Sequence, residues 1–168
     1  MSAHIGSLLF GRKWILVVSI PVLIAAWWAF RPEKLWIDQK VSEAAPFASS
    51  SDPQPLYTGR FEGKAHPTSG RATIYGGAAG MQYVRLTDFT TSNGPDVHVV
   101  LARSDDKGLS QNIVTGQLDK VELGLLKGNQ GDQNYYLPAS LDLKKYNVVV
   151  VYCERFHAIF GIGRLEPF

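Results

Sequence analysis

The sequence contains a single cysteine, Cys153, among 168 residues. No intramolecular disulfide can form, so the stability of any folded domain has to come from a hydrophobic core. A lone thiol is either buried and inert or accessible and reactive, and the sequence leaves both alternatives open.

The chain also lacks the short motifs that usually identify an enzyme. It has no GxSxG elbow, no phosphate-binding loop, no HExxH and no CxxCH haem-attachment run. His66, His98 and His157 are scattered singly, which is a poor pattern for metal ligands. Cys153 and His157 are four residues apart, about 13 Å on an extended strand, which is too far to share a metal ion unless a turn intervenes. We therefore expect no metal site, identify no cofactor, and leave enzymatic activity undecided.

An excess of one charge sign is missing from most of the chain. Residues 57–168 hold twelve Lys/Arg and eleven Asp/Glu, so the pI of about 8.7 comes largely from the residues that flank an apolar run near the N-terminus. Without a basic face, no nucleic-acid partner is expected. The loop acids lack the spacing of a calcium loop, and we interpret them as solvated turn residues. They are Asp88, Asp96, Asp105 and Asp106.

The apolar run covers residues 14–30, WILVVSIPVLIAAWWAF, and contains no charged side chain. As a helix it would rise about 26 Å, which is at the short end of what spans a bilayer. Trp14 stands at one edge and Trp27–Trp28 at the other, where indole rings favour the headgroup boundary. This pattern predicts one transmembrane helix, with the lipid bilayer as its partner.

A cleaved signal peptide is the alternative interpretation of this run. No small-x-small cleavage site follows it, and bulky aromatic residues occupy that position, which favours an uncleaved anchor. The basic flanks are nearly balanced, but residues 1–13 contain no acid, so we expect a short cytoplasmic tail and an extracytoplasmic C-terminal domain. Residues 31–56 include the Ala-, Ser- and Pro-rich stretch EAAPFASSSDPQP and are predicted to be a flexible tether.

Residues 57–168 are long enough for one domain with its own core. Short runs of β-branched and alternating apolar residues, separated by turn residues, predict an all-β domain, an antiparallel β-sandwich or barrel. The run NVVVVYC indicates a central strand buried on both faces, with Val149 and Val151 in the core. The expected strands are 58–63, 71–77, 81–87, 96–102, 120–127, 133–138, 147–153 and 158–165.

Three segments of this domain are candidates for function. NGPD is a turn that enters a strand, where Gly94 can adopt positive φ and Pro95 fixes its own φ. GNQG is the tip of a predicted hairpin over 123–138 and forms either a plain connection or a ligand cradle of backbone amides. VYCERF, residues 151–156, places Cys153 beside aromatic residues. The candidate loop residues are Asn93, Gly94, Pro95, Asp96, Gly128, Asn129, Gln130 and Gly131.

These segments, in their order along the chain, resemble the DM-thirteen domain, a module also found in Skeletor-type extracellular proteins. The resemblance rests on FEGKAHPTSG, LTDF, NGPDVHVVL, LGLLKGNQGDQNYYLP and LDLKKYNVVVVYCERFHAIFGIGRL, and it covers about residues 57–168. It implies a β-sandwich-like extracytoplasmic domain. It also implies an electron-transfer or thiol-redox role centred on the family's characteristic cysteine, here Cys153, which Tyr152 precedes.

Two functional hypotheses follow. In the first, the chain is a membrane-anchored electron-transfer or thiol-redox module that works through Cys153 with a separate redox partner. His66 or Tyr152 would then be the nearest candidates to hold an unidentified cofactor. In the second, it is a non-catalytic binding or adhesion module that uses the NGPD and GNQG loops, and Cys153 belongs only to the core.

Overall fold

The computed structural model describes residues 17–28, 36–46, 53–77, 80–103 and 119–168. The chain divides into two compact units, Met1–Trp36 and Ile37–Phe168. In the first unit residues 17–28 form a helix with exposed apolar side chains. No helix that the structure describes reaches the length and hydrophobicity that a membrane crossing requires. Part of the predicted anchor, including Trp14, lies outside the described residues, and the anchor stays a prediction.

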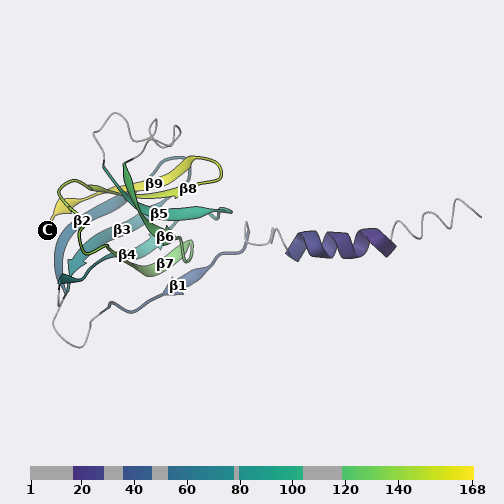
Figure 1. Ribbon diagram of the computed structural model, residues 1–168, viewed down its shortest axis with the longest axis horizontal. Coiled ribbons are helices and arrows are strands. Elements are labelled where there is room, and N and C mark those ends of the chain that lie inside the picture. Colours follow the sequence, from purple (N-terminus) through teal and green to yellow (C-terminus); the bar gives the residue numbers. More distant parts are fainter. Residues whose placement is uncertain (1–16, 29–35, 47–52, 78–79, 104–118) are drawn as a thin grey trace, which may run out of the picture. The chain divides into compact units, whose positions relative to one another are not determined.

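The second unit is one curled β-sheet (Figure 1). Its strand order is β1-β7-β4-β3-β2-β9-β8-β5-β6, with β10 paired to β2. Every pairing is antiparallel except that of β1 with β7. The strands are β1 Lys40–Ser42, β2 Gln54–Gly63, β3 Ser69–Gly76, β4 Gln82–Thr90, β5 Val97–Ala102, β6 Lys120–Leu125, β7 Gln130–Tyr136, β8 Val148–Cys153, β9 Ala158–Arg164 and β10 Glu166–Pro167.

The structure contains all eight strands that the sequence predicts, within a few residues at their ends. Of the two predicted architectures, the single curled sheet corresponds to the barrel-like one. The prediction of a purely antiparallel sheet was wrong, because β1 pairs with β7 in parallel. β1 comes from residues 31–56, where we expected only a flexible tether, and β2 also begins within that range. β1 was missed because KVS is too short to show a period.

The predicted hairpin over residues 123–138 is also wrong. β6 pairs with β5, whereas β7 pairs with β4 and β1, so these consecutive strands belong to opposite ends of the sheet. A curled sheet brings its two ends back toward each other, and the short connection 126–129 crosses the seam between them. Side chains, described below, bridge this seam where ladder hydrogen bonds are missing.

β8 lies between β9 and β5 and is therefore an interior strand, though not the middle one of the sheet, and it is buried on both faces, as its continuous apolar run predicts. Val149, Val151 and Cys153 face the main core inside the curl, together with Phe61 and Phe89, whose rings meet edge to face at 5.2 Å. The alternate residues of β8 belong to a second cluster on the outer face. Val149 and Val151 are fully buried, which confirms both as core residues.

Candidate functional site

Cys153 is the last residue of β8, and its thiol is fully buried in the main core. It pairs with Val97 of β5 on one side and with Ala158 of β9 on the other. A turn over 154–157 follows, which is the one arrangement that could bring His157 near Cys153 for a shared metal ion. His157 is exposed, however, whereas the thiol is buried. Thiol–disulfide exchange requires direct attack at sulfur, so a partner's thiol cannot react with Cys153 in this conformation.

Tyr152, next to Cys153, points to the opposite face of the sheet and meets charged groups there. Its ring is 2% exposed, and its hydroxyl donates to the Glu154 carboxylate and accepts from the Lys120 ammonium. Lys120 Nζ also lies 3.1 Å from Glu154 and 4.4 Å from the centre of the tyrosine ring. A buried phenol thus connects the core strand to an ion pair at the surface.

His98 of β5 extends this group of polar side chains, and sequence reasoning missed it. Its ring lies 6.0 Å from that of Tyr152, with Nδ1 2.5 Å from Glu122 and Nε2 3.0 Å from Asp96. Burial by itself lowers the pKa of His98, but hydrogen bonds and charge from Glu122 and Asp96 outweigh it and raise this pKa above its ordinary value. Asp96 is therefore a partner of the imidazole rather than a solvated turn residue. The sequence signal for this site is the alternation of DVHVV, which places Asp96 and His98 on one face of a strand, and that of KVELG, which offers Glu122 on another.

We predict that His98 makes the stability of the domain depend on pH. Because its pKa is raised in the folded state, its contribution is fully present below the unfolded-state pKa of about 6.5 and is lost as the pH rises through the folded-state value. The free energy of unfolding should therefore fall as the pH rises from about 6.5 through the folded-state pKa. Urea unfolding across that range measures the slope, and His98→Gln should flatten it. An unchanged slope in the variant would contradict the assignment.

The other candidate residue, His66, lies against Phe160, with ring centres 4.0 Å apart. No hydrogen bond or ring contact between described residues joins His66 to Cys153. Among the described residues no group of three His, Cys, Asp or Glu side chains could hold a metal ion. The structure thus does not bring the two weak cofactor candidates, His66 and Tyr152, together around the thiol.

The two predicted binding loops come together, but on a residue of the same chain. Asn93 of NGPD and both Asn129 and Gln130 of GNQG direct side-chain amides at the Asp38 carboxylate. Gly94 is needed for space rather than for positive φ, because a Cβ there would lie 2.6 Å from the Val97 side chain. The side-chain amides of GNQG therefore bind a carboxylate of the same chain, Asp38, which the sequence did not reveal.

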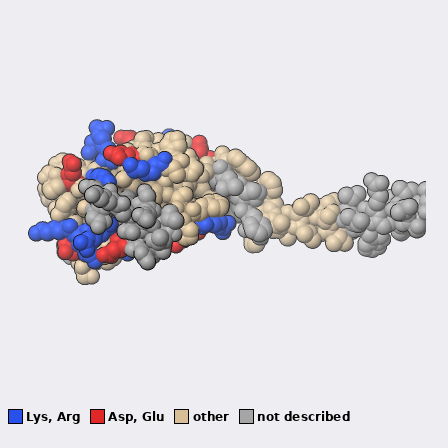
Figure 2. Space-filling view, turned by 90° about the horizontal axis from the view of Figure 1, so that it is seen from above, with Lys and Arg blue, Asp and Glu red and all other residues tan. Residues whose placement is uncertain are grey.

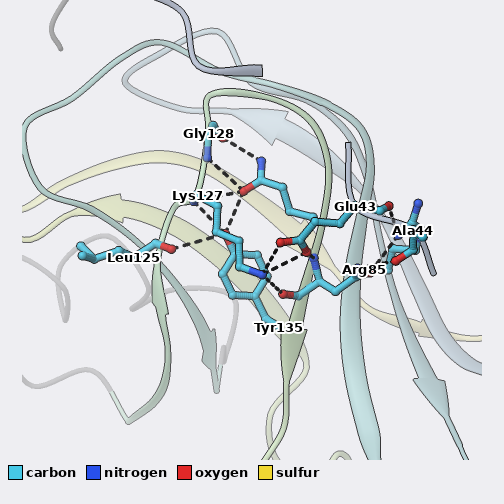
Figure 3. A network of polar contacts seen from close by, with 9 residues as sticks. Glu43, Ala44, Arg85, Leu125, Lys127, Gly128 and Tyr135 are labelled. Carbon is cyan, nitrogen blue, oxygen red and sulfur yellow. Dashed lines mark hydrogen bonds and ion pairs between the residues drawn. The ribbon is translucent and has the colours of Figure 1, made fainter. Parts of the chain in front are cut away.

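Lys127, labelled in Figure 3, and Gln133 bridge the seam between β6 and β7. The fully buried Gln133 accepts from the Lys127 and Gly128 N–H groups at 3.1 and 3.3 Å, and donates to the Gly128 carbonyl at 2.7 Å. Tyr135 donates to Gln133 at 2.9 Å, and burial raises the pKa of Tyr135 well above its ordinary value. This network holds the backbone of the GNQG connection in place from its buried side.

A shallow cavity of about 370 Å³ opens beside the ends of β3 and β4. The hydroxyls of Thr68 and Thr91, 2.8 Å apart, belong to its lining. Its lining contains hydroxyl and backbone groups but no titratable side chain, so it offers no acid, base or nucleophile beyond alcohols. The lining residues are Gly63, Pro67, Thr68, Ser69, Thr90, Thr91 and Ser92.

Comparison with known proteins gives one match. Residues 60–165 match the family model described as "Electron transfer DM13". No curated protein matches the chain, and no solved structure matches it. The matched range includes Cys153, the charged group around Tyr152 and both candidate loops, but it begins after β1.

Proposed function

The chain belongs to the electron transfer DM13 family, whose model matches well over half of it, and on that premise we propose its function. From that membership we propose that it is an electron-transfer protein whose domain works outside the cytoplasm, behind a membrane anchor at residues 14–30. The single observation that carries the electron-transfer role is the family match over residues 60–165. The anchor and the extracytoplasmic side are supported by the uncharged run and by the acid-free tail before it.

We further propose that Cys153 is the centre of this transfer, its thiol losing one electron to a separate one-electron oxidant and its proton to water to give a thiyl radical, and that no disulfide forms. The complete burial of the thiol supports the second part, since thiol exchange would need contact with sulfur. Tyr152, the residue next to Cys153, would connect this strand to the surface through its hydrogen bonds to Lys120 and Glu154. The Lys120–Glu154 ion pair and His98 would there face the partner.

The second candidate function is a binding module in which Cys153 is purely structural. The burial of Cys153 in an apolar cluster favours it, because buried cysteines ordinarily behave as small hydrophobic residues. It loses support at the two loops, whose amides are occupied by Asp38.

Substituting Cys153 separates these two functions. Cys153→Ser should fold, with a loss of about 1–3 kcal/mol because a hydroxyl enters an apolar site. Under the electron-transfer proposal, redox titration of the purified full-length chain gives a signal that disappears in this variant. Cys153→Ala is the matched control, because it removes sulfur without adding a polar group and should lose the same signal. A redox titration that is unchanged in both variants would contradict the electron-transfer role of Cys153 and show that this residue is structural.

Alkylation tests the burial on which the argument depends. The native thiol should react at least 100-fold more slowly than the thiol of the chain in denaturant, because only transient opening exposes it. Equal rates in both conditions would show that sulfur is accessible, and thiol exchange would then return as a mechanism.

A further inference from the structure

We propose that the edge of β7, with the side-chain amides of Asn93, Asn129 and Gln130, is a binding site for an extended acidic segment. Its ligand in this chain is the segment of residues 38–43. The site is separate from the electron-transfer role and uses none of the residues around Cys153. The ligand class is a strand with a carboxylate at each end of a short polar stretch.

The first carboxylate, that of Asp38, is held by three neutral donors from two loops. Asn129 Nδ2 lies 2.8 Å and Asn93 Nδ2 3.2 Å from Oδ1, and Gln130 Nε2 lies 3.0 Å from Oδ2. Asn129 is 5% exposed and is itself fixed, since it also donates to the Thr91 carbonyl at 3.2 Å. The Asn129 amide is thus held by a contact that does not involve the carboxylate, as is typical of a recognition site.

The backbone of the segment adds a parallel strand to the sheet. Lys40, Val41 and Ser42 pair with residues 130–132 of β7. The segment forms hydrogen bonds with β7 at both ends: Gln130 N donates to the Gln39 carbonyl at 3.2 Å, and Glu43 N to the Asp132 carbonyl at 3.0 Å. Addition of an extended segment to an exposed sheet edge is a common mode of peptide recognition, in which the main chain supplies affinity and side chains supply specificity.

Two glycines of the GNQG loop make room for this approach. A Cβ on Gly128 would lie 2.4 Å from the Gln39 carbonyl oxygen, and one on Gly131 would lie 2.0 Å from that of Val41. Gly131 also has a φ of 96°, a conformation that other residues rarely adopt. The loop is therefore shaped for contact with another backbone.

The second carboxylate, that of Glu43, lies at the far end of the segment (Figure 3). Lys127 Nζ approaches its two oxygens at 2.7 and 3.0 Å, and Asn134 N donates to it at 2.7 Å. Burial alone would raise the pKa of Glu43, but these contacts outweigh it and lower the pKa, so the carboxylate is charged at neutral pH. Arg85 donates to the Glu43 carbonyl at 3.0 Å.

The segment is a ligand rather than a part of the core. Among the described residues 36–46, none belongs to either hydrophobic cluster or packs against the main one. Lys40 and Ser42 are exposed, and Val41 is only half-buried. The segment therefore adds no apolar side chain to either cluster, and its contacts with Arg85, Lys127 and Asn134 are polar.

The consequence for the whole chain rests on the anchor proposed above. With residues 38–43 bound, seven residues lie between the segment and the anchor, and even fully extended they would span at most about 25 Å. Release of the segment would extend that reach through residue 53, so binding sets how far the domain can travel from the membrane.

Cleavage of the full-length chain tests the proposal. A protease site introduced within residues 47–52 separates the segment covalently from the domain, and an N-terminal affinity tag then reports whether the two pieces stay together. We expect the tagged N-terminal piece, which contains residues 38–43, to retain the domain after cutting. An excess of synthetic peptide 37–46 should displace it, whereas the same peptide carrying Asp38→Asn and Glu43→Gln should not. Separation of the wild-type pieces on cutting would overturn the proposal.

Substitutions then test the recognition itself. Asp38→Asn and Gln130→Glu should each weaken retention by about 10- to 100-fold. The first places an amide opposite the amide of Gln130, and the second places a carboxylate opposite that of Asp38. Together they should restore part of it, since an amide at 38 again faces a carboxylate at 130. Lys40→Gln, which removes an exposed charge from the same strand, is the control and should retain the domain fully. Equal retention by all variants would overturn the proposal.

Thermal melts of the uncut variants exclude misfolding as the cause of lost retention. The tag-based readout depends neither on electron transfer nor on membrane insertion. Failure of the proposed function would therefore leave its result unchanged, and the reverse also holds.

Discussion

Replacement of Val151 by aspartate should prevent the domain from folding stably. Val151 is fully buried in the middle of β8, with Val99 of β5 on one side and Gly161 of β9 on the other. No Lys, Arg or His is among the buried residues that the structure describes, so the carboxylate would be buried without a partner. Such a burial costs more than about 4–5 kcal/mol, which is most of the stability of an ordinary domain.

Circular-dichroism melting of the purified variant measures this effect, and two controls isolate its cause. Val151→Ala removes volume without charge and should still melt cooperatively, at a lower temperature. Leu125→Asp places the same charge on β6 at a side chain that is 61% exposed, and it should change the melting temperature little. A Val151→Asp protein that melts near the wild-type temperature would show that β8 is not an interior strand buried on both faces.

The predictability of β8 and its neighbours follows from where their information lies in the sequence. NVVVVYC carries its own evidence, because only a strand covered on both faces tolerates six consecutive apolar residues between Asn147 and Glu154. The eight predicted strands share this property, since each shows a local run or alternation. Their sheet partners do not, and β6 and β7 were wrongly paired because a short connection between strands usually means a hairpin.

The candidate site was only partly predictable for a related physical reason. The loops NGPD and GNQG were recognised from their glycine, proline and asparagine content, which reports on backbone shape and exposed amides. Their common target was not, because Asp38 is about 90 residues away from GNQG in the chain and shows no local pattern. His98 was likewise passed over: the alternation of DVHVV places Asp96 and His98 on one face, but Glu122 lies on a neighbouring strand, and only the fold brings it to the imidazole.

Closure of the curled sheet depends on Gln133 in a way that no strand pattern could indicate, and Gln133→Leu should reveal it. Leucine fills a similar volume, so the loss comes from hydrogen bonds rather than from a cavity. Without the amide, the Gly128 N–H and carbonyl both lose the partners they have in Gln133, in a fully buried position. Two orphaned backbone groups cost on the order of 2–4 kcal/mol.

The loss in Gln133→Leu should appear in urea unfolding, and its location should appear in hydrogen exchange. We expect faster exchange first at residues 126–129, where the connection crosses the seam, and only later in β8. Gln82→Leu makes the same substitution at a half-buried position of β4 and should cost well under half as much. If both variants unfolded at the wild-type urea concentration, the seam between β6 and β7 would be held by the strands' own packing. Because those strands share no ladder hydrogen bonds, we expect the side-chain amide to decide the outcome.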